Sequence, residues 1–556
     1  MKQIAISVVA LAAFACPADA AVVISSGATS HIRCAHGVCT PRSKNAVLNV
    51  TELQNLLANS DVTVTTGSAG AVAIAVSSPL TWASAHRLTL DSVGNVSIKA
   101  AVVSEGTGGM TITPDDGGTS GGLIISPGGS ISFWDNSSSL IVAGNAYTLV
   151  SDIGTLALDV ASSPSGFYAL AKDYDATGDG TYTDAPVTAP LTGTFEGLGH
   201  TISNLTVSAS GTANRDFGFF AQVSGTARDL ALANANINCN TLGTESGLLA
   251  GVNSGNLINV SAAGTLTCPS GDTGGLVGSN QGSGTIAHAS ASVNIFGSAS
   301  LGGLVGAASA SSTISFSTAS STLSAPQGAM VGGLVGVEGG LIEDSHATPT
   351  NMATATAASV GGLVGYLDGT IERCSAGNSF GIGAVADGGL VGTAFVATID
   401  SSFATGQVNA RRDVGGLVGA ADGNVTIANS YSTATVNRAG GGVDTLGGLV
   451  GTFKNGVSIS TSWSSGQVAD KKREVRGGLV GSISSATVTA GYWDLDASGV
   501  GDPSQGAGNL ANAPGITGLT TTQFQSGLPS GFDPSVWGQS LSINGGYPYL
   551  LANPPQ

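Results

Sequence analysis

One short motif returns through the second half of the chain at steps of 27–32 residues. Eight copies read Gly-Gly-Leu-Val-Gly, with central leucines at Leu276, Leu304, Leu334, Leu363, Leu390, Leu417, Leu449 and Leu479. Two looser copies, centred on Phe219 and Leu249, come before them. A fixed period of this length indicates a solenoid, in which each unit buries its apolar face only against its neighbours.

A second pattern lies 8–10 residues after each motif leucine, where an aliphatic residue such as Ile286, Ile371 or Ile459 recurs. The third and fifth residues after it stay small, while the fourth varies. Because side chains alternate along a strand, the small residues then point into a narrow core and the fourth residue points outward. Because every unit runs the same way, its strands must stack in parallel, about 4.8 Å apart. The sequence therefore predicts an all-β fold, a right-handed parallel β-helix (solenoid) of 27–32-residue coils with N- and C-terminal caps.

The chain is expected to have five segments: a signal peptide (1–20), a lead-in and N-terminal cap (21–60), an irregular β-helix region (61–200), regular repeats (201–490) and a C-terminal cap (491–556). Lys2, the apolar run after it and the small residues at 18–20 are typical of a secretory signal. Cys16 leaves lipid attachment as the alternative. The lead-in is expected to hold a short helix at 52–58, after Thr51.

Composition narrows the possible partners. Glycine supplies 84 of 556 residues, which suits the tight corners of a solenoid, and charged residues make up only 10%. The net charge of −17 argues against nucleic acid and against anionic membrane surfaces, because both require basic patches. No membrane span is expected in the mature chain. We expect export to the cell surface or the medium, with the periplasm as the alternative.

The cysteines that follow the signal peptide suggest two disulfides. Cys34 and Cys39 lie five residues apart in a glycine-containing loop. Cys239 and Cys268 are one repeat step apart, and stacked coils bring equivalent residues within bridging range. Cys374 would then remain as a buried thiol. An exported protein permits both bridges.

The repeats also resemble a known family. Gly-Gly-Leu-Val-Gly followed by the pattern of Thr398–Val408 is similar to the GLUG-motif repeats of bacterial secreted and surface proteins. The similarity extends upstream through 193–202 and downstream through 518–521 and 546–549, so that it covers roughly residues 165–550. Some members are filamentous-haemagglutinin-like adhesins, and others are proteases in which the repeats are accessory. The resemblance implies an exported, adhesin-like protein.

Four aromatic residues form the most specific binding hypothesis. They share the fourth, outward position on four successive coils: Phe403, Tyr431, Trp463 and Tyr492. An exposed aromatic ladder would suit sugar rings or a protein partner. The alternative is that the rings stack on each other to shield the last coils, or lie under the C-terminal cap.

Other candidate sites are weaker. Oxygen donors imitate a calcium loop at Asp173, Asp175, Thr177 and Asp184, but an Asp/Gly-rich turn explains them equally. Two Gly-x-Ser-x-Gly matches, at 118–122 and 377–381, are expected by chance, and His200 is expected to be structural. No carboxylate recurs at a fixed coil position through the repeats, and the basic residues, including the run at 471–473, fall in variable loops. We therefore expect no enzyme and no cofactor.

The predicted function is surface interaction, with glycans or cell-surface proteins as partners. A polysaccharide-binding or polysaccharide-modifying protein and a purely structural spacer remain the alternatives.

Overall fold

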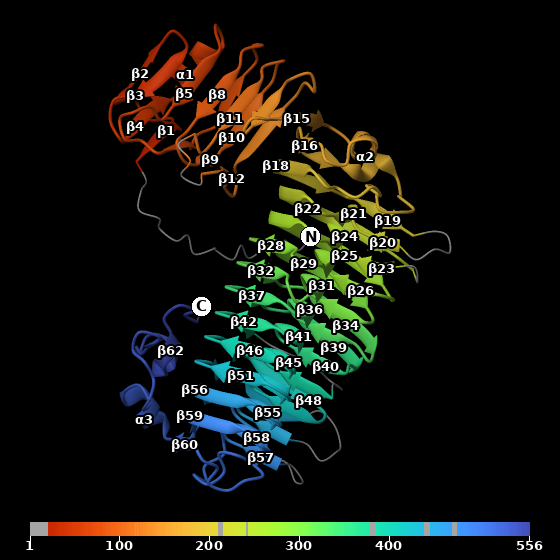
Figure 1. The fold of residues 1–556 in the computed structure, drawn as a ribbon, viewed down its shortest axis with the longest axis vertical. Coiled ribbons are helices and arrows are strands. Elements are labelled where there is room, and N and C mark those ends of the chain that lie inside the picture. Colours follow the sequence, from red (N-terminus) through yellow and green to blue (C-terminus); the bar gives the residue numbers. More distant parts are fainter. Residues whose placement is uncertain are drawn as a thin grey trace, which may run out of the picture. The chain divides into compact units, whose positions relative to one another are not determined.

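The computed structural model describes residues 20–116, 118, 121–209, 215–240, 243–377, 385–438, 445–469 and 475–555 (Figure 1). The expected signal peptide up to residue 19, the basic run at 471–473 and parts of both Gly-x-Ser-x-Gly matches lie outside these residues. The chain divides into two compact units. Unit 1 is Met1–Ser151 with Ala169–Lys172, and unit 2 is Asp152–Tyr168 with Asp173–Gln556.

Unit 1 is a short β-helix with three strands in each coil. Its three parallel columns are β5 (Val62–Thr65), β8 (Leu88–Asp91), β11 (Met110–Thr113), β14 (Leu140–Val142); β6 (Ala73–Val76), β9 (Val96–Ile98), β12 (Leu123–Ile125); and β7 (Leu80–Trp82), β10 (Ala101–Ser104), β13 (Ser130–Phe133). Alternate residues of most strands are buried, as the alternating sequence predicts.

The lead-in to unit 1 contains a hairpin, two parallel strands and a helix. Its elements are β1 (Ala21–Ser25), β2 (Ile32–Ala35), β3 (Val38–Pro41), β4 (Ala46–Asn49) and α1 (Val50–Leu57). The helix expected at 52–58 is thus present but begins two residues earlier. Asn49 caps it, because its side chain accepts the N–H groups of Thr51 and Glu52. The strand β15 (Asn145–Val150) closes the unit against β14 in antiparallel fashion.

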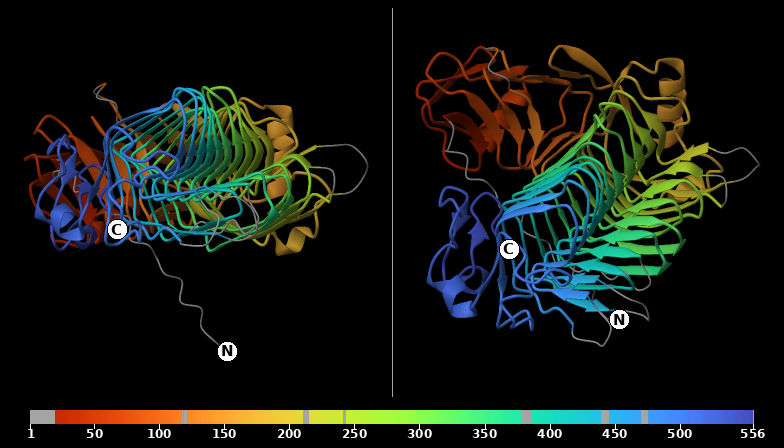
Figure 2. Two further views of the ribbon diagram at one scale, coloured as in Figure 1. Left: turned by 90° about the horizontal axis from the view of Figure 1, so that it is seen from below. Right: turned by 60° about the horizontal axis from the view of Figure 1, so that its bottom comes forward.

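Unit 2 is a long parallel β-helix with three sheets (Figure 2). Among the described residues, sheets 1 and 2 have ten strands each. Sheet 1 contains β20 (Arg215–Phe217), β23 (Gly243–Ser246), β26 (Asp272–Gly274), β30 (Ser300–Gly302), β35 (Met330–Gly332), β40 (Ser359–Gly361), β44 (Ala386–Gly388), β49 (Asp413–Gly415), β54 (Thr445–Gly447) and β57 (Val475–Gly477). Sheet 2 contains β21 (Phe220–Val223), β24 (Ala250–Asn253), β27 (Val277–Asn280), β31 (Val305–Ala308), β36 (Val335–Glu338), β41 (Val364–Leu367), β45 (Val391–Ala394), β50 (Val418–Ala421), β55 (Val450–Phe453) and β58 (Val480–Ile483).

Sheet 3 carries the remaining strands of the coils. They are β18 (Thr194–Ser203), β22 (Thr226–Asn238), β25 (Asn256–Cys268), β28 (Thr285–Ala287), β29 (Ser290–Gly297), β32 (Thr313–Ser315), β33 (Thr318–Ala319), β34 (Thr322–Gln327), β37 (Leu341–Glu343), β38 (His346–Ala347), β39 (Asn351–Thr356), β42 (Thr370–Glu372), β43 (Ser375–Gly377), β46 (Ala397–Asp400), β47 (Phe403–Thr405), β51 (Val425–Ala428), β52 (Tyr431–Ser432), β56 (Ser458–Ser464), β59 (Thr487–Asp494) and β60 (Ile516–Leu519). Equivalent residues pair in parallel from coil to coil, for example Ile342 with Ile371 and Ile371 with Ile399. The predicted parallel β-helix is confirmed.

The repeated motif is the corner between sheets 1 and 2. Its first glycine ends one strand, the next Gly-Leu pair turns, and Val-Gly begins the strand of sheet 2. Leu334, the central leucine of one copy, is completely buried. A Cβ on Gly333 would lie under 3.0 Å from the carbonyl oxygen of Gly362 in the next coil. Glycine is therefore required because backbone approaches backbone there, although the residue does not need a positive φ.

Smaller elements complete the chain. They are α2 (Ile153–Ser162), β16 (Phe167–Leu170), β17 (Tyr174–Asp175), η1 (Ala176–Asp179), β19 (Thr206–Ser208), the pair β48 (Gln407–Ala410) and β53 (Thr435–Arg438), α3 (Thr521–Ser526), β61 (Trp537–Gly538), η2 (Asn544–Gly546) and β62 (Tyr549–Leu550). None of the helices in the described part of the chain is long and apolar enough to cross a membrane.

Candidate functional site

Each coil of sheet 3 bends at one residue with a left-handed backbone. This residue lies two positions after the inward aliphatic residue, and its φ falls between 40° and 54° in Asp229, Asn259, His288, Phe316, Asp344, Arg373, Ser401, Asn429, Thr461 and Ala490. Asn and Asp adopt this conformation with little penalty, whereas a bulky residue such as Phe316 is strained by it. The bend divides the outer face of sheet 3 into two sets of side-chain columns.

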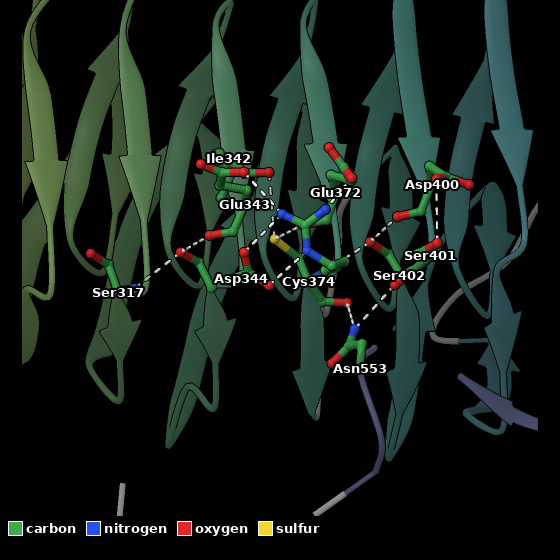
Figure 3. Close-up of polar contacts among 12 residues, drawn as sticks. Ser317, Ile342, Glu343, Asp344, Glu372, Cys374, Asp400, Ser401, Ser402 and Asn553 are labelled. Carbon is green, nitrogen blue, oxygen red and sulfur yellow. Dashed lines mark hydrogen bonds and ion pairs between the residues drawn. The ribbon is translucent and has the colours of Figure 1, made fainter. Parts of the chain in front are cut away.

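Small polar side chains of successive coils form a ladder on the inner side of this bend (Figure 3). Ser402 shows the pattern: its Oγ donates to the Asp400 carbonyl at 2.7 Å and accepts the Cys374 N–H at 3.0 Å. The same two bonds are made by Ser317, Ser430 and Ser462. Each hydroxyl thus joins two consecutive coils and is itself hydrogen-bonded although it is buried.

The ladder also holds the free thiol. Cys374 is completely buried, and its Sγ lies 3.3 Å from the Glu372 carbonyl oxygen. Burial raises the pKa of Cys374 to about 12, so the group is a neutral thiol at physiological pH. A buried neutral thiol is not a nucleophile.

A charged cluster lies just outside this ladder. The Arg373 guanidinium bonds Asp344 through Nε and Nη2, both at 2.8 Å, and its Nη2 lies 2.9 Å from Glu343 Oε2 (Figure 3). Glu372 pairs with the same guanidinium. These carboxylates raise the pKa of Arg373, which stays charged. One arginine therefore links the side chains of two successive coils.

This cluster is a local exception to the expectation that no carboxylate recurs at a fixed coil position through the repeats. Carboxylates do recur at a fixed coil position, because Glu343 pairs with Glu372 and Glu372 with Asp400 on adjacent strands. The recurrence covers three coils and then stops, since the next equivalent residue is Ala428. The signal was visible as an acidic residue directly after the inward isoleucine.

The four aromatic residues occupy the predicted outward column, but they are not exposed. Phe403, Tyr431 and Trp463 stack with ring centroids 4.9 and 4.8 Å apart and interplanar angles of 7° and 0°. The exposed fractions are 5% for Phe403, 0% for Tyr431 and Trp463, and 8% for Tyr492. Their faces are occupied by each other, so no face is free for a sugar ring. This corrects the expectation of an open binding ladder in favour of its alternative, stacking beneath the C-terminal cap.

The segment that covers these rings is called the C-terminal cover here (residues 520–555). It contributes large side chains to one cluster with the aromatic column: Phe524, Phe532, Trp537 and Leu550. Tyr547 stacks on Trp463 with centroids 5.3 Å apart. Among the described atoms, Tyr431 Oη, Trp463 Nε1 and Trp537 Nε1 are buried without a hydrogen-bond partner. The contact is therefore held by aromatic packing more than by polar bonds.

Both proposed disulfides are formed in the structure. Cys34 and Cys39 face each other across the β2–β3 hairpin. Cys239 and Cys268 join two successive coils, with Cα atoms 4.9 Å apart. Both sulfurs of the second bridge are buried in unit 2.

Removing the second bridge is expected to destabilise unit 2. The bridge closes a segment with a sequence separation of 29 residues, and loop-closure entropy for that length is worth about 3–4 kcal/mol. The double variant Cys239→Ser, Cys268→Ser should lower the free energy of unfolding by about that amount in urea titrations. The shorter bridge between Cys34 and Cys39 supplies the comparison. Its removal should lower the free energy of unfolding by only about 2 kcal/mol. An unfolding midpoint that reduction does not alter would contradict this stabilisation.

The residues of the proposed calcium loop are engaged in separate contacts. Asp173 Oδ1 accepts a backbone N–H of the next coil at 2.9 Å. Asp175 Oδ1 accepts the Thr177 N–H at 3.0 Å. Asp184 forms an ion pair with Arg215. Within the described ranges, no three His, Cys, Asp or Glu side chains are grouped so as to hold a metal ion.

One further cluster was not foreseen from the sequence. Glu196 and Asp229 are buried on adjacent strands and hydrogen-bonded to each other, with Arg228 Nε at 3.3 Å from Glu196 and 2.9 Å from Asp229. Burial and the charge of Asp229 raise the pKa of Glu196 well above its usual value. Glycoside hydrolysis uses carboxyl groups about 5 Å or more apart. This pair, in direct contact, does not fit that chemistry.

A column of hydroxyl and amide side chains lies on the outer face of sheet 3, directly before each inward aliphatic residue. Its members, in register from coil to coil, are Thr226, Asn256, Thr285, Thr313, Thr370, Thr398, Thr426, Ser458 and Thr487. Leu341 interrupts the column between Thr313 and Thr370. We call it the hydroxyl column. Thr285 Oγ1 donates to Asn256 Oδ1 at 2.8 Å, and Thr398 and Thr426 are exposed. The recurring Thr-Ile pair was its signal in the sequence.

Comparisons with known proteins agree with the repeat assignment. Residues 410–437 match the sequence model of the GLUG motif family, which confirms the resemblance for that stretch. A segment of 164 residues is 35% identical to halomucin of Haloquadratum walsbyi; it is 29% of this chain and 2% of halomucin. The chain thus corresponds to a very small part of that relative.

Two solved structures show weaker likeness. A candidate immunoglobulin A1 protease from Bacteroides ovatus is 14% identical, with 73% of this chain and 92% of that chain covered and a TM-score of 0.22. An IgA1 protease is 17% identical, with 58% of this chain and 22% of that chain covered and a TM-score of 0.24. Likeness at these TM-scores supports no inference about activity.

Proposed function

We propose that this chain is an exported or surface-located scaffold that binds a hydroxyl-rich partner, such as a glycan, along the hydroxyl column. The observation that carries the proposal is the register of this column: equivalent hydroxyl or amide groups recur on nearly every coil of unit 2 and face outward. The GLUG-motif match and the likeness to halomucin support a surface or secreted setting.

Physical chemistry favours this surface over the others described. Hydroxyl and amide groups both donate and accept hydrogen bonds, which suits a polymer with many hydroxyl groups. Side chains held by a β-sheet are already ordered, so less conformational entropy is lost on binding. The aromatic column is covered, and the carboxylates around Arg373 are already paired with it.

The test compares two triple variants of the hydroxyl column. Thr370→Val, Thr398→Val and Thr426→Val together remove three hydroxyls and keep the β-branched shape, whereas Thr→Ser at the same positions keeps the hydroxyls. On glycan arrays and on whole cells, the valine variant should bind about tenfold or more weakly, equivalent to about 1.4 kcal/mol. The serine variant should bind like the natural chain. Equal binding by all three chains would exclude the hydroxyl column, and no binding by the natural chain would favour a structural spacer.

The carboxyl pair of Glu196 and Asp229 is the nearest approach to catalytic chemistry, and we propose that it acts as a polar link between coils. A search for activity on soluble polysaccharides, comparing the natural chain with Glu196→Gln, tests this assignment. If the natural chain cleaved a polysaccharide by hydrolysis or elimination and Glu196→Gln did not, the assignment as a polar link would be contradicted.

A further inference from the structure

The C-terminal cover is attached to unit 2 at points far apart along the solenoid. Near the end of the chain, the Asn553 side chain is 5% exposed, and its Nδ2 donates to the Cys374 carbonyl at 3.0 Å and to the Ser401 carbonyl at 3.2 Å (Figure 3). These carbonyls belong to two consecutive coils, 179 and 152 residues before Asn553. A single amide therefore spans both.

The cover is also fixed at β59, near the C-terminal end of sheet 3. Asp494 is completely buried, and its Oδ2 accepts the hydroxyls of Tyr547 at 2.7 Å and Thr521 at 2.8 Å. Tyr492 Oη donates to the Ser530 carbonyl at 2.8 Å. The aromatic column fills the space between these attachments. The cover thus contacts every coil from Cys374 to Asp494.

Most contacts in a solenoid join only neighbouring repeats, so its ends can open one coil at a time. A segment that is bonded at both ends of a run of coils prevents this stepwise opening. No coil of the run can then open unless the segment also gives up its contacts with the other coils. We propose that the C-terminal cover is a strap that makes the coils from Cys374 to Asp494 open as one unit, with Asn553 as the residue that fastens its free end.

The chain contains a suitable reporter for this behaviour. Cys374 is the unpaired cysteine of the described residues, it is completely buried, and its carbonyl is one of the two that Asn553 holds. A thiol reagent reaches it only when its coil opens. The full chain is used throughout, with Cys16→Ser so that labelling reports Cys374 alone.

The experiment measures the rate of Cys374 labelling in Asn553→Leu and in a matched control. The leucine keeps the size of the side chain and removes two hydrogen bonds, which together are worth about a thirtyfold change in opening. Gln525→Leu is the control, because Gln525 Nε2 bonds only the Gly545 carbonyl, at 3.0 Å, within the cover. We expect labelling to accelerate at least tenfold in Asn553→Leu and at most about threefold in the control. Equal rates in all chains would overturn the proposal.

Hydrogen exchange supplies a second readout that does not depend on the thiol. The N–H groups of Phe403, Tyr431 and Trp463 each bond a carbonyl of the preceding coil at 3.1 Å. In the natural chain, these three amides should exchange at closely similar rates. In Asn553→Leu, the rates should become graded, with Phe403 fastest because its N–H bonds the Cys374 carbonyl at the end that Asn553 fastens. Graded rates already present in the natural chain would also overturn the proposal.

Discussion

Gly333→Ala is expected to lower the free energy of unfolding of unit 2 by more than about 3 kcal/mol. The added Cβ would lie under 3.0 Å from the carbonyl oxygen of Gly362 and close to the Ala347 side chain. Neither backbone can move away alone, because each is hydrogen-bonded to coils on both sides: the Gly333 N–H donates to the Gly361 carbonyl at 3.1 Å. Relief therefore requires the corner to open.

A second glycine of the same unit provides the control. A Cβ on Gly377 would meet its nearest heavy atom, Thr405 Oγ1, at 3.5 Å, which is ordinary van der Waals contact. Gly377→Ala should therefore change the free energy of unfolding by less than about 1 kcal/mol. Urea unfolding followed by circular dichroism measures both variants. Equal stabilities of the two would contradict the claim that backbone contact explains the motif.

This difference between glycines shows what periodicity can and cannot predict. The repeat predicted the stacking of equivalent residues, and the register of Ile342, Ile371 and Ile399 confirms it. It also placed the aromatic column on the outer side of the strand. It could not predict the cover, because Leu550 and Phe403 lie far apart in the chain and share no periodic pattern.

The contact between Glu196 and Asp229 could not be predicted from the sequence for a different reason. The strand β18 is irregular between Glu196 and His200, where extra residues interrupt its pairing with β22. Counting along the sequence therefore loses the register just where the two carboxyls meet. A bulge moves side chains relative to the next strand, and only coordinates show which of them come together.

Glu338→Leu is expected to stabilise unit 2 at neutral and mildly alkaline pH. Glu338 is completely buried, and its Oε1 accepts the Gly340 N–H at 2.6 Å. Its Oε2 has no hydrogen-bond partner among the described atoms. The equivalent residues of the neighbouring coils are Ala308 and Leu367, so the site accommodates an apolar side chain. The leucine removes an unmatched polar group from the core.

The pH dependence of this gain distinguishes it from a simple packing effect. Burial raises the pKa of Glu338 from 4.5 to about 8, so the folded chain keeps a proton between these values that the unfolded chain has lost. The contribution of Glu338 to the stability of the natural chain therefore falls as pH rises from about 4.5 to 8, by about 4–5 kcal/mol in total, and becomes level above that. Glu338→Leu should show a gain of several kcal/mol at pH 8 that shrinks to about 1 kcal/mol or less at pH 4.

Urea titrations of the natural chain and Glu338→Leu between pH 4 and 9 measure this difference directly. The exposed Asp368 supplies the control, since Asp368→Asn should follow the natural chain at every pH. A gain for Glu338→Leu that is the same at pH 4 and pH 8 would mean that Glu338 is ionised in the folded chain. Its charge would then need a cation or solvent beside it within the core.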